Sequence, residues 1–221
     1  WHVLRSGMRA RDIRGDPKIV SDLRQIEKYF PMQVELGCGP SIESGIPPLH
    51  YFHTLYNVSE PIKGTFIFGP DKDKFLKDIV TNPTDFYRRS SVLYSAALVA
   101  EPTPFYRLLQ ELHSEKVVVG DIITNNFDGL CRLVDLKERY LRRFDEPQLF
   151  PKIDFHPDAR SLLVVGAHAD RRKVEKLARD KGLQVIYVDP EGYRDENGRF
   201  VSYPLESSQD EDILIRMTAQ Q

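Results

Sequence analysis

A glycine-rich string is the first feature of this sequence that could do chemistry. Residues 37–41, Gly-Cys-Gly-Pro-Ser, follow a short apolar run. Glycines directly after a buried strand let the backbone approach a ligand, and amides at the start of a following helix suit phosphate. No Gly-Lys-Ser/Thr follows, so the string is not a Walker loop. A tight strand-to-helix turn without a ligand would use the same glycines, so both interpretations stay open.

Polar or small residues also follow three other apolar segments. Asn126 and Asp128 follow Thr124, the residues Gly-Ala-His follow Val165, and Asp189 follows Val188. A carboxylate that ends a strand can accept hydrogen bonds from ribose hydroxyls, as in dinucleotide-binding folds. Asp189 would equally cap a turn before a proline. An Asx turn could also close the strand at the Asn-Asp pair, but it would not explain the whole Asn-x-Asp-Gly-Leu string.

Hydrophobic spacing predicts the elements that must position these residues. The predicted strands are 33–36, 116–119, 121–124, 161–165 and 183–188. The predicted helices are 85–100, 104–113, 170–181 and a short one at 211–218, with 23–30 as the end of another. The run 161–165 is apolar throughout, which is typical of a strand buried on both faces.

Alternating strands and helices predict a single α/β domain over residues 1–221, with a core over about 20–218. We expect a Rossmann-like parallel sheet with helices on both faces, joined by right-handed crossovers. Ligands bind such sheets outside the carboxyl ends of the strands. The turns after Leu36, Thr124, Val165 and Val188 should therefore meet on one rim, where the chemistry is to be sought.

Composition excludes several classes of protein. The chain has 221 residues, with 31 Lys and Arg against 33 Asp and Glu, a net charge of −2. This is not the basic surplus of a general nucleic-acid binder, and no apolar run approaches the roughly 18 residues of a membrane helix. Two cysteines exclude a four-cysteine zinc site. We expect a cytoplasmic protein that binds neither nucleic acid nor membrane, with its oligomeric state open.

Several strings together resemble the sirtuins, the Sir2 family of NAD-dependent enzymes. Residues 37–47 resemble the family's Gly-Ala-Gly-Ile-Ser-x-x-Ser-Gly-Ile-Pro, and 124–130, Thr-Asn-Asn-Phe-Asp-Gly-Leu, resemble its Thr-Gln-Asn-Ile-Asp-Gly-Leu. Residues 102–106 look like the start of its Pro-Asn-x-x-His helix. The strands 162–166 and 185–189 stand where sirtuins have Leu-Leu-Val-Ile-Gly and Val-Ile-x-Ile-Asn.

The resemblance implies NAD or ADP-ribose as the ligand, with the glycine string at the phosphates and residues 57–84 as the variable cofactor loop. It implies that Asn126 orients water or the ribose and that Asp128 holds the nicotinamide carboxamide. The cofactor-binding residues it implies are Gly37, Cys38, Gly39, Ser41, Ser44, Pro47, His50, Asn125, Asn126, Asp128, Gly166, Ala167, His168 and Asp189.

The chain also departs from the family pattern. Pro-Leu-His at 48–50 replaces Asp-Phe-Arg, and Asn125 replaces a glutamine. Sirtuins have a catalytic histidine after the Asn-x-Asp string, whereas this chain has no histidine from 124 to 155, and alignment puts Phe144 at that position. The interval 144–161 leaves no room for the family's zinc-binding small domain, so we expect no metal site.

Three functions remain open on this sequence. An enzyme that breaks the nicotinamide–ribose bond, by hydrolysis or ADP-ribosyl transfer, needs mainly positioning and electrostatic stabilisation. A lysine deacylase would have to replace its base. A non-catalytic NAD or ADP-ribose binding module, with or without a protein partner, would explain the absences without further assumptions.

Overall fold

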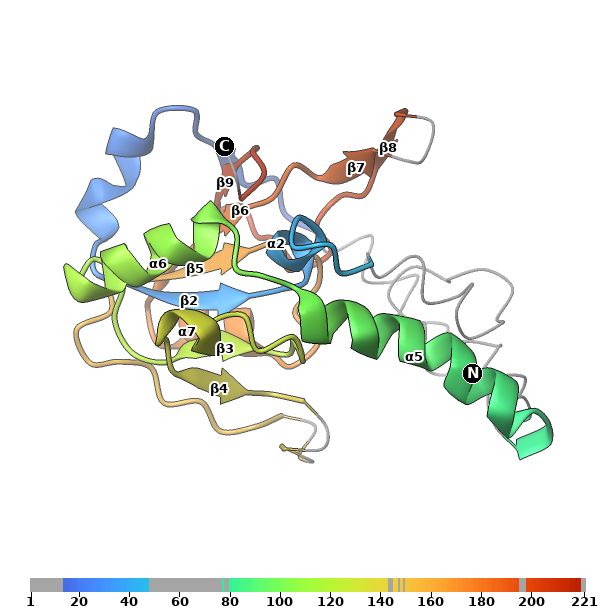
Figure 1. The fold of residues 1–221 in the computed structure, drawn as a ribbon. Coiled ribbons are helices and arrows are strands. Elements are labelled where there is room, and N and C mark those ends of the chain that lie inside the picture. Colours follow the sequence, from blue (N-terminus) through green and yellow to red (C-terminus); the bar gives the residue numbers. More distant parts are fainter. Residues whose placement is uncertain are drawn as a thin grey trace.

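A seven-stranded parallel sheet forms the centre of the molecule. The computed structural model describes residues 14–47, 77, 80–142, 145–146, 148, 150–194 and 198–219. The strand order is β1-β9-β6-β5-β2-β3-β4, and each neighbouring pair is parallel (Figure 1). The strands are β1 (Lys18–Ile19), β2 (Met32–Leu36), β3 (Ile122–Thr124), β4 (Glu138–Tyr140), β5 (Ser161–Val165), β6 (Gln184–Val188) and β9 (Ile213–Ile215).

The apolar runs of the sequence form β5 and β6, at the centre of the sheet. β5 pairs with β2 over five residues, from Met32↔Ser161 to Leu36↔Val165, and with β6 over five more. Both faces of these strands are covered, which is why their apolar residues are nearly continuous. The carboxyl ends of β2, β3, β5 and β6 lie at one edge of the sheet, and the predicted rim is confirmed.

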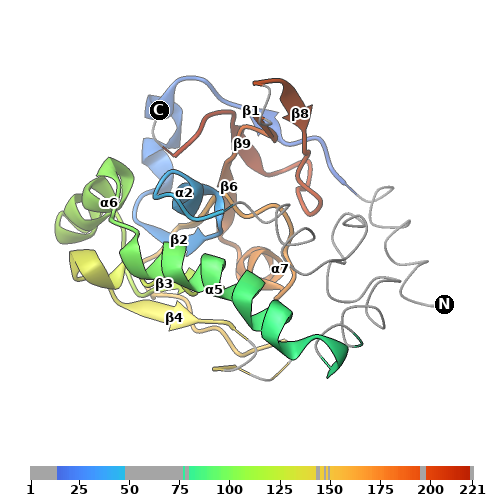
Figure 2. The same ribbon diagram turned by 45° about the vertical axis from the view of Figure 1, so that its right-hand side comes forward.

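Helices cover both faces, as the sequence predicts. Val34 and Leu36 pack with Tyr106 and Leu109 of α6 (Pro104–Ser114) on one face. On the other face, α7 (Val174–Asp180) packs on β5 and β6. Figure 2 shows α6 and α7 on opposite sides of the strands. Helix α2 (Gly39–Ile42) and the 3-10 helix η3 (Arg132–Val134) also lie on the α6 side of the sheet.

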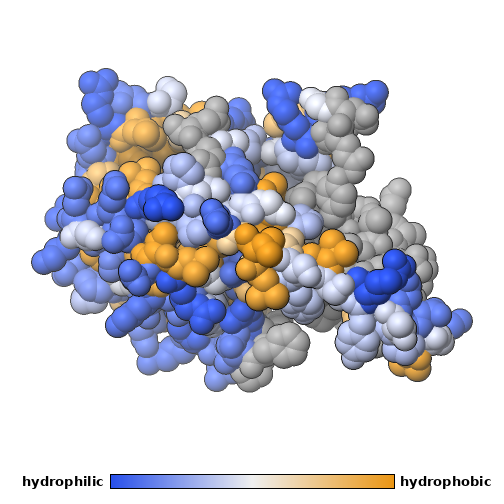
Figure 3. All heavy atoms as spheres, in the orientation of Figure 1, coloured by the Kyte–Doolittle hydropathy of each residue, from blue (hydrophilic) through white to orange (hydrophobic). Residues whose placement is uncertain are grey.

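Helix α5 (Pro83–Val99) corresponds to the predicted helix 85–100 and extends away from the sheet (Figure 1). Only part of it packs on the core, through Leu93 and the following Ala100. Leu98 and Val99 are 86% and 78% exposed. Apolar side chains form a band across this face of the molecule in Figure 3.

Four predictions of secondary structure need correction. The predicted helix 211–218 is wrong: Ile213–Ile215 form β9, because all three residues are buried between β6 and β1. Residues 23–30 form a 3-10 helix, η1 (Leu23–Tyr29). The helix 170–181 is shortened to α7, because Asp170 caps it by accepting the Lys176 N–H at 2.9 Å. The strand 116–119 is reduced to a single bridge between Val118 and Met32.

Several elements were not expected from the sequence, among them β1 and η3. β4 has the polar sequence Glu-Arg-Tyr and lies at the edge of the sheet. β7 (Gly192–Arg194) and β8 (Phe200–Ser202) form an antiparallel hairpin after β6. Of the expected cofactor loop 57–84, residues 57–76, 78 and 79 lie outside the described residues. Within the described part of the chain, no helix is long and apolar enough to cross a membrane.

Candidate functional site at the carboxyl edge of the sheet

The glycine string packs against the turn that follows β5. Gly37 N–H donates to Val165 O at 2.9 Å, and Gly39 N–H donates to Gly166 O at 3.1 Å. A Cβ atom on Gly37 would lie 2.3 Å from Gly166 O, and one on Gly39 would lie 2.8 Å from Gly166 Cα. Gly166 itself has a φ of +61°, in the left-handed region. Close approach of two turns therefore explains these glycines without a ligand.

Three amides of this string already donate to acceptors in the protein. Besides Gly37 and Gly39, the Ser41 N–H donates to Cys38 O at 3.1 Å, and Pro40 has no N–H. Helix α2 has only four residues. These contacts therefore do not support the expectation that the start of the helix presents its amides to a phosphate group. Cys38 is exposed at this turn.

Ser41 links the glycine string to the Asn-Phe-Asp-Gly segment, 87 residues further along the chain. Its side chain is buried, and its Oγ donates to Asp128 Oδ2 at 2.7 Å. The Tyr106 hydroxyl lies 3.3 Å from the same Oγ. The second oxygen of the Asp128 carboxylate, Oδ1, accepts the Leu130 N–H at 3.0 Å. Both carboxylate oxygens thus hold the segment in place.

Asn126 joins the same two turns from the other side. Its Nδ2 donates to Gly37 O at 2.7 Å and lies 3.3 Å from Ser41 Oγ. Its backbone N–H donates to Thr124 Oγ1, and that hydroxyl donates to Leu36 O. The structure therefore brings Ser41, Asn126 and Asp128 together, as the rim predicts. Asn125, on the same segment, is exposed.

The turn after β5 leads to an aromatic stack. The His168 ring lies parallel to the Tyr203 ring, with centroids 3.5 Å apart and planes 13° apart. His168 Nε2 lies 3.3 Å from Glu206 Oε1, and the Glu206 N–H donates to His168 O at 3.0 Å. Gly166 and Ala167, the two residues before His168, are half-buried. His168 thus contacts the segment that follows the β7–β8 hairpin.

Asp189 lies at the carboxyl end of β6. Its Oδ1 accepts the Glu191 N–H at 2.6 Å, which is the turn-capping contact that the sequence allowed. Partial burial raises the pKa of Asp189 to about 6, although the Glu191 hydrogen bond opposes this shift. A ribose contact by Asp189 stays a prediction.

Three further predicted contacts follow the glycine string. Ser44 Oγ is shielded from solvent, and no hydrogen-bond partner lies near it among the described residues. Pro47 is half-buried. His50 lies outside the described residues, as does Phe144, the residue aligned with the family's histidine.

Sequence reasoning missed three polar partners at this edge. Tyr106 is fully buried on α6, where its position is that of an ordinary core residue. Tyr203 and Glu206 follow the hairpin that was not expected. A search for buried polar side chains in the elements that flank the rim would have found Tyr106 alone.

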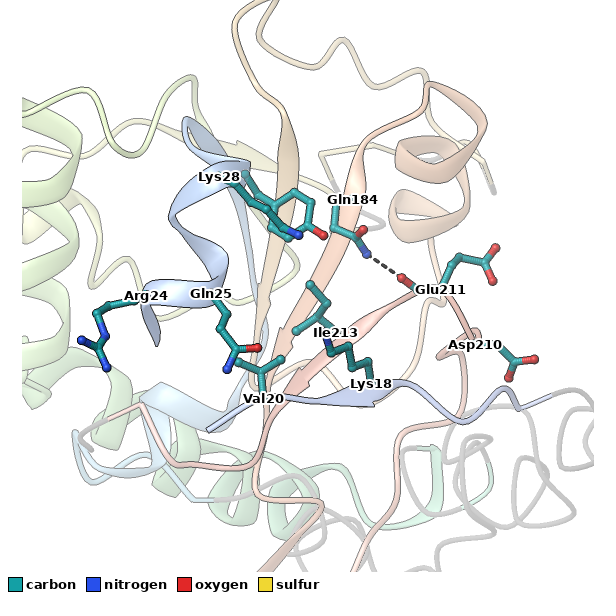
Figure 4. Close-up of a pocket in the computed structure, with 10 residues that line it drawn as sticks. Lys18, Val20, Arg24, Gln25, Lys28, Gln184, Asp210, Glu211 and Ile213 are labelled. Atoms are coloured by element: carbon teal, nitrogen blue, oxygen red, sulfur yellow. Dashed lines mark hydrogen bonds between the residues drawn. The ribbon is translucent and has the colours of Figure 1, made fainter. Parts of the chain in front are cut away.

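The recess in Figure 4 lies elsewhere, at the opposite edge of the sheet. Lys18, Gln184 and Ile213 line it, and each begins its strand or lies at its amino end. Its volume is about 470 Å³, and Lys18, Arg24 and Lys28 share it with Asp210 and Glu211. This recess therefore differs from the rim in two ways: it lies at the amino ends of the strands, and side chains of both charges line it. No cluster of three metal-ligating side chains occurs in residues 14–219 that the structure describes.

Comparisons with known proteins agree with the sequence resemblance at the level of fold. No family model and no curated protein matches the chain. A crystal structure of a Sir2 homologue in complex with NAD matches with a TM-score of 0.63 and 16% identity, over 93% of this chain and 92% of that one.

Two further structures match with similar coverage. A mutant Sir2 homologue with 2′-O-acetyl ADP ribose has a TM-score of 0.57 and 18% identity, over 89% of this chain and 90% of that one. A complex of Sir2 with a p53 peptide and NAD⁺ has a TM-score of 0.53 and 15% identity, over 89% and 92%. Over about 90% of its length, this chain has the sirtuin fold.

Proposed function

We propose that this protein binds NAD at the carboxyl edge of the sheet and breaks the nicotinamide–ribose bond. The contact of Ser41 with Asp128 and Asn126 is the observation that carries the proposal. It joins the two strings that resemble sirtuins, 87 residues apart, into one cluster beneath the rim. The sirtuin fold over 93% of the chain supports the same ligand, since the matching Sir2 homologue is an NAD complex.

The residues of the rim offer suitable partners for a dinucleotide. Among the residues that the structure describes, the shielded Ser44 hydroxyl has no hydrogen-bond partner, and a ligand that binds it would offset the cost in free energy. Asp189 presents a carboxylate at the end of β6 for ribose hydroxyls.

Bond cleavage asks for positioning more than for strong acid–base groups. The carbon–nitrogen bond breaks, its electron pair neutralises the pyridinium nitrogen, and the ribose carbon becomes oxocarbenium-like. Asn126 orients the attacking water, and the Asp128 carboxylate holds the carboxamide of the leaving group. Fixed dipoles of this kind stabilise charge that develops in the transition state.

Binding without turnover is the second candidate, and one observation favours it. The Asn126 amide and both oxygens of Asp128 already have protein partners. A ligand must displace these contacts or use the remaining lone pairs. In this alternative the cluster holds the two turns in shape for NAD or ADP-ribose, and no bond is broken.

Nicotinamide release by the purified chain distinguishes the two candidates. We expect wild type to convert NAD to nicotinamide and ADP-ribose, followed by chromatography, and Asn126→Ala to lose about 100-fold or more of this rate. Gln25→Ala, which removes an exposed amide at the opposite edge of the sheet, is the matched control and should keep the wild-type rate. Binding of NAD by a wild type that releases no nicotinamide would establish the second candidate instead.

A further inference from the structure

The strand β4 places two functional side chains beside the candidate site. It pairs with β3 in the register Ile122↔Glu138 and Thr124↔Tyr140. Paired residues of a parallel sheet point to the same face, and residues two apart on a strand do so as well. Glu138 and Tyr140 therefore share the face of Thr124, whose hydroxyl accepts the backbone N–H of Asn126.

Glu138 and Tyr140 form a carboxylate–phenol pair. The Glu138 side chain is 2% exposed, and Tyr140 OH donates to its Oε2. The Arg132 Nε lies 3.4 Å from the same oxygen, and the Arg142 guanidinium lies 4.0 Å from the centre of the Tyr140 ring. Tyr140 itself is half-buried. The phenol thus lies between a buried carboxylate and the solvent side of the sheet edge.

The surroundings of the pair raise the pKa of the Glu138 carboxyl group. Burial raises the pKa of Glu138 above its ordinary value, and the charge of Asp128 raises it further. Hydrogen bonding from Tyr140 and the charges of Arg132 and Arg142 lower it, but burial is the largest cause. The titratable and charged groups that face Glu138 are Tyr140, Arg142, Arg132, Cys131 and Asp128.

Arg132 connects this pair to the Asn-Phe-Asp-Gly segment. A Cβ atom on Gly129 would lie 3.1 Å from Arg132 Nη2, so the guanidinium lies directly against the segment. Arg132 therefore contacts Glu138 and the segment that carries Asn126 and Asp128. The pair lies next to the site.

We propose that Tyr140 and Glu138 are the proton acceptor of this site, in the stretch where the sequence has no histidine. The inference rests on the proposed NAD cleavage. As the carbon–nitrogen bond breaks toward nicotinamide, the water oxygen bonds to the ribose carbon. The water proton passes to the Tyr140 oxygen while the phenol proton passes to the Glu138 carboxylate, which later releases it to solvent. NAD⁺ and water thus give ADP-ribose, nicotinamide and one proton.

Two variants test the pair. Tyr140→Phe removes the hydroxyl and keeps the ring, and Glu138→Gln removes the charge and keeps the shape. General-base catalysis contributes about 10²–10⁴-fold, so we expect each variant to lose at least 100-fold in nicotinamide release at pH 7. ADP-ribose affinity by calorimetry should stay within about twofold of wild type. Tyr87→Phe on α5, 69% exposed, is the matched control and should keep the wild-type rate.

The pH profile separates proton transfer from a structural role. Wild-type release should rise with pH as Glu138 loses its proton and then reach a plateau, whereas both variants should release slowly without this rise. Variants that release nicotinamide at the wild-type rate, or keep the wild-type profile, would overturn the inference while NAD cleavage stands. A wild type that releases no nicotinamide would overturn both. If Glu138→Gln shows no thermal transition and is therefore unfolded, the result for Tyr140→Phe alone tests the inference.

Discussion

Two polar networks occupy opposite faces of the same sheet, and they differ in how they are built. The rim network, Ser41, Asn126 and Asp128, comes from turns and is partly accessible to solvent. The network beneath α7, Glu175, Tyr187, Arg179 and Asp212, comes mostly from regular elements. Of these, Glu175, Tyr187 and Asp212 are at most 1% exposed. Both contain carboxylates held by hydroxyl groups, so residue type alone does not separate them.

The network beneath α7 is closed by an ion pair. Arg179 donates to Asp212 at 3.0 and 2.6 Å and to the Tyr187 hydroxyl at 2.8 Å. Tyr187 OH in turn donates to Glu175 Oε2 at 2.7 Å. This chain of contacts ties α7 to β6 and to the residues before β9. Glu35, on β2, adds a half-buried carboxylate whose pKa is raised by burial and by the charge of Glu175.

The contrast indicates which polar groups serve a ligand and which serve the fold. Buried pairs on helices and strands have no approach for a small molecule, so their removal should affect stability. Rim groups on turns lie where ligands bind parallel sheets, so their removal should affect binding more than folding. Four substitutions test this division.

The largest loss of stability is expected from Asp212→Ala. It leaves the Arg179 guanidinium without its carboxylate, and breaking a buried pair costs about 3–5 kcal/mol. Urea unfolding measures the change in the free energy of unfolding. Asp180→Ala, which breaks an exposed pair with Lys176, is the matched control and should cost less than about 1 kcal/mol. A loss below about 1 kcal/mol for Asp212→Ala would mean that this network does not stabilise the fold.

Glu175→Gln should flatten the dependence of stability on pH. Burial, with the charge of Asp170, raises the pKa of Glu175 to about 7 in the folded state. Between pH 4.5 and 7 the folded state keeps a proton that the unfolded state has released. Wild-type stability therefore falls by about 1.4 kcal/mol per pH unit as the pH rises through this window. Urea unfolding at several pH values should show the variant gaining on wild type toward pH 7.5, and parallel curves would contradict the assignment.

The elements could be predicted where burial is continuous. Residues 162–165 and 185–188 are aliphatic or aromatic throughout because both faces of the sheet are covered, and the sequence predicts both strands. β4 was missed because an edge strand of Glu, Arg and Tyr shows no apolar alternation. Ile213–Ile215 is too short for periodicity to distinguish a strand from a helix, and its strand identity depends on pairing with β1 and β6.

The site could be predicted as a rim but not as a set of contacts. Chain order and parallel topology bring the turns after Leu36 and Thr124 together, and Ser41 does meet Asp128. The sequence cannot tell that Gly39 contacts Gly166 rather than a phosphate, since a ligand and a neighbouring turn both require glycine. Tyr140 was not found because its position depends on the register of the unexpected strand β4.

Asp128→Ala should weaken ligand binding, and its effect on folding should be smaller than that of Asp212→Ala. Removing the carboxylate leaves Ser41 Oγ and the Leu130 N–H without their acceptor, at a cost of about 1–3 kcal/mol. We expect NAD affinity by calorimetry to fall about 10-fold to 100-fold. Asp121→Ala, an exposed change three residues before Thr124, should leave affinity unchanged. An Asp128→Ala protein with wild-type affinity would contradict the role of the rim network.

The smallest effect is expected at Asp189. Its pKa is raised to about 6, and only the ionised carboxylate accepts hydrogen bonds from both ribose hydroxyls. NAD affinity should therefore fall by about tenfold at most between pH 7 and pH 5. Asp189→Asn should bind more weakly at pH 7 and lose this dependence. If wild type and variant share one pH profile, Asp189 serves only as the cap of the Glu191 turn.

Titration calorimetry of the wild-type chain with NAD and with ADP-ribose tests the central claim most directly. A dinucleotide site at the rim predicts measurable heat at ligand concentrations up to the millimolar range, with a rise in the melting temperature that Asp128→Ala reduces. The absence of heat and of any thermal shift with both ligands would mean that the chain keeps the sirtuin fold without its ligand.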